Sequence, residues 1–526
     1  MRIRSRTEPA PPPARHRAAP GPASPVDLRA VTPDPAATGL LPEPLARELL
    51  AIPLSVGTDG IVVAVAEPDA IVHSRLEAAV GQAVVLRTAS RNDILLAIGN
   101  SYRALAGIGA RVKEFEARDT PRRDPEKAGA VSASDDAPVV QVVQLVITQA
   151  LRDRASDVHL EPQQDRVRVR YRIDGALHDV AELPGSMGPA IVSRVKILAG
   201  MNIVERRRPQ DGQISMEVEG RAVDIRVSTT AVVGGEKVVL RLLDKSRPLF
   251  RLEQLGMPEP MVARYSALLR SPYGMVICAG PTGSGKTTTL YGSLGAVNSP
   301  ERNIMTIEDP VEYTFPDVNQ IQINEAAGIG FAGGLKSILR QDPDIILVGE
   351  VRDVETARIA VQSALTGHLV LSSLHATDAP AALHRLLDMG IEGFLVASSV
   401  TAVLSQRLVR RICPHCVAYY EPSPEELAFL EALGGSDGGA GGGFVRGTGC
   451  NFCARTGYLD RIGVYELMPV TDAIRELVLD RAPHEEIRKV ARYEGMRTLQ
   501  EEALRLVANG VTNLSELLRS LYVVGG

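Results

Sequence analysis

The chain has 526 residues, more than a single hydrophobic core holds, so we expect three or four domains. Its net charge is −5, from 58 Lys and Arg against 63 Asp and Glu, and aromatic residues make up only 4% with no Trp. Nucleic-acid-binding proteins normally show a basic surface and stacking aromatic residues, so this composition argues against that class. The sequence contains no run of about 18 uncharged apolar residues, so no membrane-spanning helix is predicted. The N-terminal arginines are not followed by the apolar segment of a secretory signal. We therefore expect a cytoplasmic protein.

The N-terminal quarter contains no catalytic motif. Residues 1–36 carry nine prolines and six arginines without apolar periodicity, which predicts a disordered tail, either simply solvated or touching a partner or anionic lipid. Residues 37–103 alternate helix-like and strand-like segments and predict a small α/β module that docks a partner. Residues 104–135 are charged and interrupted by Pro121 and Pro125, which predicts a linker.

A second N-terminal domain is predicted over residues 136–245. Strands with alternating polarity are expected at 167–173, 223–227 and 237–241. This alternation places Arg226 and Arg241 among basic residues on a strand face. Such arginines can form an ordinary solvated face or act in trans on a nucleotide held elsewhere, and their position in the sequence does not distinguish the two.

A phosphate-binding loop is the most informative motif. It comprises Gly280, Pro281, Thr282, Gly283, Ser284, Gly285, Lys286 and Thr287. The motif lies between an apolar strand pattern and a helix start, a context that makes a chance glycine-rich turn improbable. The glycines let backbone N–H groups and the helix N-terminus point at phosphate oxygens, Lys286 adds a charge at the β- and γ-phosphates, and Thr287 offers its hydroxyl to Mg²⁺. We therefore expect ATP and Mg²⁺ as ligands.

Two more apolar strands in the motor domain, residues 246–410, end in carboxylates. These acids are Glu308, Asp309 and Glu312 after the first strand and Glu350 after the second. At the same sheet edge as a phosphate loop, one acid can orient Mg²⁺ and its waters, and another can accept a proton from the attacking water. Glu350 is the strongest candidate for the second role. The alternative is that each acid caps the following helix.

Two histidines, His368 and His375, flank the apolar strand 369–374. A lone histidine is usually structural. Because this pair brackets a strand of the same sheet, contact with the γ-phosphate or with a neighbouring subunit is the functional alternative.

Four of the five cysteines form two C-x-x-C pairs within residues 411–460. They are Cys413, Cys416, Cys450 and Cys453. Four thiolates suit a tetrahedral Zn²⁺ with no open position, so a structural zinc site in a reducing compartment is expected rather than four unrelated thiols. The glycine-rich segment 434–443 can loop out between the pairs. Residues 461–526 predict helices packed around this zinc lobe.

Together these motifs resemble the ATPases of type II secretion and type IV pilus assembly, with the type II secretion protein E group the most similar. The resemblance covers about residues 37–526. It rests on the phosphate loop, the acid-rich segment 306–312, the segments 340–344 and 349–353 of a variant Walker B motif, the histidine segment 366–375 and the four cysteines. It implies an α/β protein in which a RecA-like P-loop motor domain follows a PAS-like α/β domain and a small N-terminal α/β module, with a tetracysteine zinc lobe and a helical C-terminal tail.

The resemblance also implies a homohexamer with ATP between the motor domain and the domain before it. Arg226 and Arg241 match family arginines that approach the phosphates, whereas Gln213 and Lys336 stand where the family often has arginine and are not assigned. Hydrolysis would act on an inner-membrane platform protein to assemble a pseudopilus. The N-terminal module would dock on an inner-membrane partner.

Three alternatives stay open at this point. A type IV pilus extension ATPase shares the same motifs, although the short N-terminal module favours secretion. A nucleic-acid translocase could use the same motor core, but the charge balance argues against it and no nucleic acid is expected as a partner. A scaffold that binds nucleotide and hydrolyses it negligibly is the third.

Overall fold

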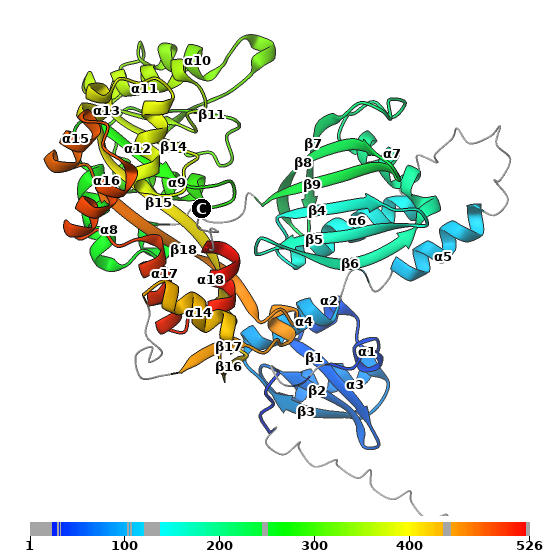
Figure 1. Cartoon of the computed structure of the whole chain (residues 1–526). Coiled ribbons are helices and arrows are strands. Elements are labelled where there is room, and N and C mark those ends of the chain that lie inside the picture. The colour runs from blue at the N-terminus through cyan, green and yellow to red at the C-terminus, as the bar shows by residue number, and fades with distance from the viewer. Residues whose placement is uncertain are drawn as a thin grey trace, which may run out of the picture. The chain divides into compact units, whose positions relative to one another are not determined.

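The computed structural model describes residues 24–28, 31, 33–102, 105, 108–119, 137–244, 251–434 and 443–521. The chain forms two compact units, one of residues 1–103 with 450–455 and the other of residues 104–449 with 456–526 (Figure 1). Most of the expected tail and of the glycine-rich segment lies outside the described residues. Within the described ranges, no helix is both long and apolar enough to cross a membrane.

The N-terminal module is a three-stranded sheet in the order β1-β2-β3. Its elements are α1 Pro35–Thr38, α2 Glu43–Glu48, β1 Ala51–Gly57, β2 Gly60–Val65, α3 Ala70–Val80, β3 Val84–Thr88 and α4 Arg91–Ser101. The module begins before the expected boundary at residue 37, because Val26 donates to the carbonyl of Thr88 at 2.9 Å and Leu28 is buried. Part of the predicted tail is therefore built into the module.

The second domain is a six-stranded antiparallel sheet in the order β6-β5-β4-β9-β8-β7. Its elements are α6 Pro138–Arg152, β4 Asp157–Pro162, β5 Arg166–Ile173, β6 Ala176–Pro184, α7 Gly188–Leu198, β7 Gln210–Val218, β8 Arg221–Val232 and β9 Gly235–Asp244. Both helices and the sheet contribute to a single core. The buried Tyr171 hydroxyl donates to the carbonyl of Val146 at 2.6 Å, which satisfies its polar end inside that core.

The expected linker 104–135 is contradicted over its first half. Helix α5, Ile108–Asp119, forms there, and Ile108, Val112 and Phe115 pack against the core of the second domain. Their spacing of four and three residues places them on one helical face. The charged residues between them make this apolar stripe narrow and easy to overlook.

The motor domain is built on a seven-stranded sheet in the order β12-β11-β13-β14-β10-β15-β18, parallel except for the last pair. Its strands are β10 Gly274–Ala279, β11 Ile304–Glu308, β12 Asn319–Gln322, β13 Ile345–Val348, β14 Leu369–Leu374, β15 Val400–Ile412 and β18 Tyr458–Pro469. Alternate residues of β10 face two different cores, which explains its continuous apolar sequence.

Helices cover both faces of this sheet (Figure 1). They are α8 Glu259–Leu269, α9 Lys286–Val297, α10 Phe331–Ile338, α11 Val354–Leu365, α12 Ala379–Asp388, α13 Gly393–Ser399, α15 Asp472–Leu479 and α16 His484–Tyr493. The α/β class expected from the sequence is confirmed.

The C-terminal region differs from the prediction that it packs around the zinc lobe. Strand β18 completes the motor sheet, and Ile474 of α15 and Ile487 of α16 lie in the same core as β10. The cysteine region is thus an insertion between β15 and β18, and it carries β16 Val417–Tyr420, α14 Pro424–Ala432 and β17 Phe444–Gly447. Helices α14, α17 Leu499–Ala508 and α18 Leu514–Leu521 share a smaller core with Val409 and Val464 of the two long strands.

Candidate nucleotide-binding site

The phosphate loop connects β10 to α9 in the conformation that its glycines allow. Gly283 has φ +77° and Gly285 has φ +90°, values that other residues rarely adopt. A Cβ on Gly280 would lie 2.5 Å from the Ser284 hydroxyl oxygen, so this position has no room for a side chain. The Lys286 ammonium donates to the carbonyls of Gly280 at 2.9 Å and Pro281 at 3.0 Å, and its burial lowers its pKa. The Lys286 ammonium therefore lies against the loop, where a phosphate group can replace the two carbonyls as its hydrogen-bond partner.

Glu350 lies close to this loop. It forms an ion pair with Arg352, its second carboxylate oxygen lies 3.6 Å from Nε2 of His375, and its negative charge raises the pKa of Lys286. Arg352 also lies 3.6 Å from the carboxylate of Asp309. Because β10, β11, β13 and β14 are parallel, their carboxyl ends meet at one sheet edge. The structure thereby brings together Lys286, Asp309, Glu350 and His375 from four separate motifs.

His368 is not part of this group. It precedes β14 at the opposite edge of the sheet, where its carbonyl accepts from the Gly274 amide at 3.1 Å and its Nδ1 lies 2.9 Å from the Ser363 carbonyl. The six residues of β14 separate the two histidines by about 20 Å. This geometry disfavours contact between His368 and the γ-phosphate of a nucleotide in the same chain, because the two ends of a strand lie at opposite edges of the sheet. Contact of His368 with a neighbouring subunit stays a prediction.

Glu308 is buried and its carboxylate is fully engaged. It accepts from the Thr306 hydroxyl at 2.6 Å, from the Gln320 amide at 3.1 Å and from the Tyr291 hydroxyl. This network joins β11, β12 and α9, so it stabilises the frame of the site. The geometry favours a structural role for Glu308 over the catalytic one that the sequence suggested.

A Glu308→Gln variant tests this assignment. We expect the free energy of unfolding to fall by about 1–3 kcal/mol, because the amide cannot accept from donors at both of its ends. Turnover per folded molecule should fall far less than in a Glu350→Gln variant. Thermal or denaturant unfolding with parallel ATPase assays measures both, and Glu325→Gln at an exposed turn serves as control. A fully stable but inactive Glu308→Gln protein would return Glu308 to the catalytic group.

Arg226 and Arg241 are direct cross-strand partners in β8 and β9, so their side chains leave the same face of the second domain. Burial raises the pKa of Glu312, and the positive charges of the two arginines offset part of this rise. The Arg241 guanidinium also donates to Asp157 at 3.1 Å. The arrangement favours the interpretation that these arginines belong to the site, and their contact with a phosphate stays a prediction.

Three further residues near the loop were not selected from the sequence. Gln406 and Arg407 lie in β15, and Asp378 begins α12. Asp378 accepts from His484 at 2.8 Å and from Arg488 at 2.6 Å, which ties helix α16 to the segment that follows His375. The available signal was the polar run Ser405-Gln406-Arg407 inside an apolar strand, since buried polar side chains need a specific partner.

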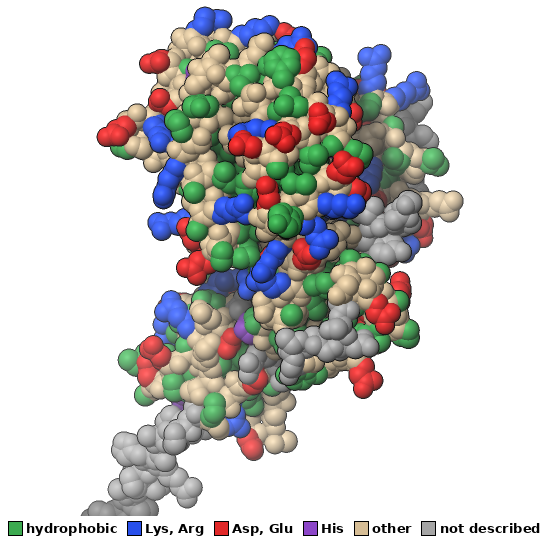
Figure 2. All heavy atoms as spheres, turned by 60° about the vertical axis from the view of Figure 1, so that its left-hand side comes forward, with side chains coloured by type: hydrophobic (Ala, Val, Ile, Leu, Met, Phe, Trp, Pro, Cys, Tyr) green, Lys and Arg blue, Asp and Glu red, His purple; other side chains and the backbone are tan. Residues whose placement is uncertain are grey.

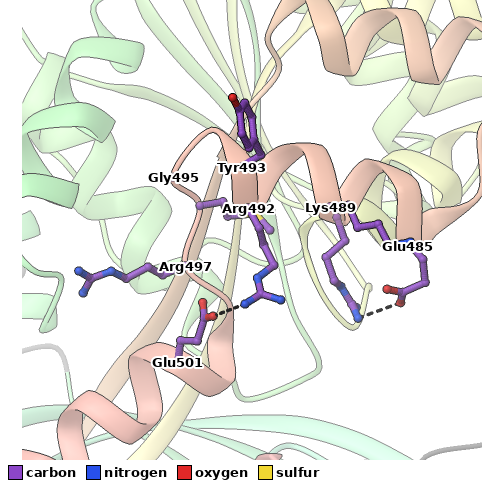
Figure 3. A pocket seen from close by; sticks show the side chains of 9 residues that line it. Glu485, Lys489, Arg492, Tyr493, Gly495, Arg497 and Glu501 are labelled. Carbon is purple, nitrogen blue, oxygen red and sulfur yellow. Dashed lines mark hydrogen bonds and ion pairs between the residues drawn. The ribbon is translucent and has the colours of Figure 1, made fainter. Parts of the chain in front are cut away.

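An open groove of about 930 Å³ on α16 is separate from this site. Figure 3 shows Arg492 directed toward Glu501, and the two side chains form an ion pair at 2.6 Å. Arg488 pairs with Glu485 at 2.9 Å in the same groove. None of the residues that line it belongs to the phosphate loop, and much of its positive charge is compensated locally.

The four cysteines form a cluster that fits a metal ion. The sulfur atoms of Cys413, Cys416, Cys450 and Cys453 all lie within 4.8 Å of one another. Those of Cys450 and Cys453 are 3.8 Å apart, and tetrahedral zinc with bonds of about 2.3 Å requires sulfur separations of roughly 3.8 Å. The donor set and its geometry thus match a closed, structural Zn²⁺ site.

Comparisons with known proteins agree with these observations. Residues 132–519 match the family described as Type II/IV secretion system protein, and residues 20–107 match the MshEN domain. The chain is 47% identical over 429 residues to the type II secretion system protein HxcR of Pseudomonas aeruginosa, covering 81% of this chain and 87% of HxcR. It is 42% identical over 395 residues to the type II secretion system ATPase E of Vibrio cholerae, covering 75% and 78%.

Two further matches extend the comparison. The type IV pilus assembly ATPase PilB of Myxococcus xanthus is 40% identical over 502 residues, covering 94% of this chain and 88% of PilB. The fold is similar to the Legionella pneumophila ATPase DotB, with a TM-score of 0.52 at 19% identity over 71% of this chain and 93% of DotB. The chain belongs to the Type II/IV secretion system protein family.

Proposed function

We propose that this chain is a hexameric ATPase that powers pseudopilus assembly and protein export in a type II secretion system. The observation that carries the proposal is the convergence of Lys286, Asp309, Glu350 and His375 at one edge of the motor sheet. The relatives of the type II secretion group, at 42% and 47% identity, support an ATPase that serves secretion.

The residues of the site have distinct tasks in this proposal. The loop N–H groups and Lys286 bind the phosphates of ATP, and Thr287 with Asp309 would hold Mg²⁺, which neutralises charge on the transferred phosphoryl group. Glu350 orients the attacking water and accepts its proton. Arg352 and His375 keep the Glu350 carboxylate in place on either side.

The remaining parts of the chain support a proposal about its partners. Arg226 and Arg241 would approach the phosphates at a hexamer interface, as the family resemblance implies. The match to an MshEN domain supports a docking role for the N-terminal module. We propose that this module binds an inner-membrane protein of the machine, that the motor acts on the platform protein, and that the ATPase works at the cytoplasmic side.

Pilus assembly is the second candidate, because the PilB relative covers 94% of this chain. The secretion relatives have higher identity over shorter alignments, which favours secretion.

A nucleic-acid translocase is less well supported. Figure 2 shows acidic and basic side chains interspersed over the visible face, and the net charge is −5.

ATP turnover and oligomeric mass should be measured together, with and without the cytoplasmic part of a candidate inner-membrane partner. Turnover that rises as a hexamer forms supports the export motor. A partner that binds without assembly or stimulation would favour a nucleotide-dependent scaffold instead.

The cysteine cluster makes a separate prediction. We expect about one Zn²⁺ per chain, and a Cys416→Ser variant should lose most of this zinc and unfold at a lower temperature. Metal analysis and thermal unfolding measure the two effects. Cys278→Ala, which removes a cysteine outside the cluster, should keep its zinc, whereas full metal content in Cys416→Ser would contradict the assignment.

A further inference from the structure

Gln406 of β15 is completely buried beside the phosphate loop. Its Nε2 donates to the carbonyl of Ser284 at 2.6 Å, and its Oε1 accepts from the thiol of Cys278 at 3.1 Å. Burial raises the pKa of Cys278 to about 12, so this thiol stays protonated and remains a donor at neutral pH. One side chain therefore connects the strand that enters the loop with the loop itself.

The two hydrogen bonds require an amide at this position. The Ser284 carbonyl needs a donor and the Cys278 thiol needs an acceptor, and glutamine supplies both from one group. Glutamate would place an acceptor against the Ser284 carbonyl, and methionine would leave that carbonyl without its donor. The chemistry of the contact thus distinguishes glutamine from its nearest equivalents in size.

The contact also shapes the loop. With its carbonyl held toward Gln406, the peptide after Ser284 is fixed in orientation, so the N–H of Gly285 points to the other side. The loop lies so close to β15 that a Cβ on Gly280 would be 2.7 Å from the Gln406 carbonyl oxygen, and one on Gly285 would be 3.1 Å from Nε2 of Gln406.

Arg407, the next residue, acts on another part of the site. Its guanidinium donates to the carbonyl of Thr377 at 2.7 Å and to that of Gln406 at 3.1 Å. Thr377 lies in the segment between His375 and α12. Two consecutive residues of β15 thus hold the phosphate loop and the segment that follows His375.

We propose that Gln406 is a positioning residue that pre-organises the phosphate loop for ATP. The inference rests on the proposed ATPase function and deepens it. A loop already held in its binding conformation does not have to be ordered by the nucleotide, so the contact should contribute mainly to affinity. Gln406 itself need not touch the substrate.

Three substitutions test the proposal in the full-length chain, namely Gln406→Met, Gln406→Glu and Gln406→Asn. Affinity for a fluorescent ATP analogue is measured by titration, and KM and kcat by steady-state assays. We expect the Met and Glu variants to lower affinity and raise KM about tenfold, with kcat changed by less than about threefold. Gln406→Asn keeps the amide on a side chain that is one methylene shorter. It should therefore lose less affinity than the Met and Glu variants.

A second measurement reports on the loop directly. Alkylation of Cys278, followed by peptide mass mapping, should be faster in Gln406→Met because the thiol loses its acceptor and its cover loosens. Gln149→Leu, which removes a buried glutamine amide in the second domain, is the matched control and should change neither affinity nor the rate at Cys278.

The outcomes separate this inference from the proposed function. Folded Met and Glu variants with wild-type affinity would overturn the positioning role, as would an equal loss of affinity in Gln149→Leu. If the Met variant does not fold, the same comparison is made with Gln406→Asn and Gln406→Glu. A wild-type chain that binds the analogue but does not hydrolyse ATP, even with the inner-membrane partner present, would refute the proposed ATPase function. The affinity measurements would still test Gln406 in that case.

Discussion

Replacing Glu350 by glutamine is expected to lower ATP turnover by about 100-fold or more while nucleotide binding is retained. The Glu350 carboxylate lies between Arg352 and His375, and it is near enough to Lys286 to influence its pKa. Glutamine preserves the size of the side chain but cannot accept a proton from water. The loss should therefore fall on kcat, with affinity for ATP close to that of the unchanged protein.

The experiment combines steady-state turnover with titration of a fluorescent ATP analogue. Glu355→Gln is a suitable control, because Glu355 is 60% exposed and pairs with Lys336 on the surface, a contact of small energetic value. Turnover at the wild-type rate in Glu350→Gln would remove Glu350 from its assigned role and direct attention to Asp309 and Glu312.

The second large effect is expected from Lys286→Ala, which should reduce ATP affinity by at least about 100-fold and abolish turnover. Lys286 is held over the loop by the carbonyls of Gly280 and Pro281, so its charge is already in place when the phosphates arrive. Alanine removes this charge and leaves both carbonyls exposed to a polyanion. Repulsion by these dipoles adds to the loss.

Titration of the same ATP analogue measures the effect, and thermal unfolding checks that the loop variant is folded. Lys336→Ala, in which a largely exposed lysine on α10 is removed, controls for the loss of one positive charge. Comparable affinity in Lys286→Ala and Lys336→Ala would mean that the loop does not bind the triphosphate in the expected manner.

Several features could be read from the chain because each lies within a short segment. The order strand, glycine-rich loop, Lys-Thr and helix predicts the connection from β10 to α9, and the two C-x-x-C pairs predict a cluster of four thiolates. The acid at the end of β13 is likewise a local pattern. Local backbone and spacing requirements are visible in sequence, since the residues that satisfy them are neighbours.

Other features were missed or interpreted differently from the sequence, because they depend on contacts between segments that are distant in the chain. His368 and His375 look equivalent in sequence, yet strand β14 carries them to opposite edges of the sheet. Glu308 resembles the other strand-end acids, but residues of α9 and β12 surround it and occupy its oxygens. Helix α5 was missed because its apolar face is narrow and is buried only by packing against the core of the second domain.

The amino-acid sequence alone thus specified the phosphate loop, the pairs of cysteines, the acids and the α/β class, because these follow from local motifs and periodicity. Only the folded chain revealed the group of Lys286, Asp309, Glu350 and His375, the contact of Gln406 with the loop, and the closure of the motor sheet by β18. Gln406 lies more than 100 residues beyond Ser284, and pairing of β15 with β10 brings the two into contact. Such contacts between distant segments arise from burial of the whole sheet, and no local pattern of residues encodes them.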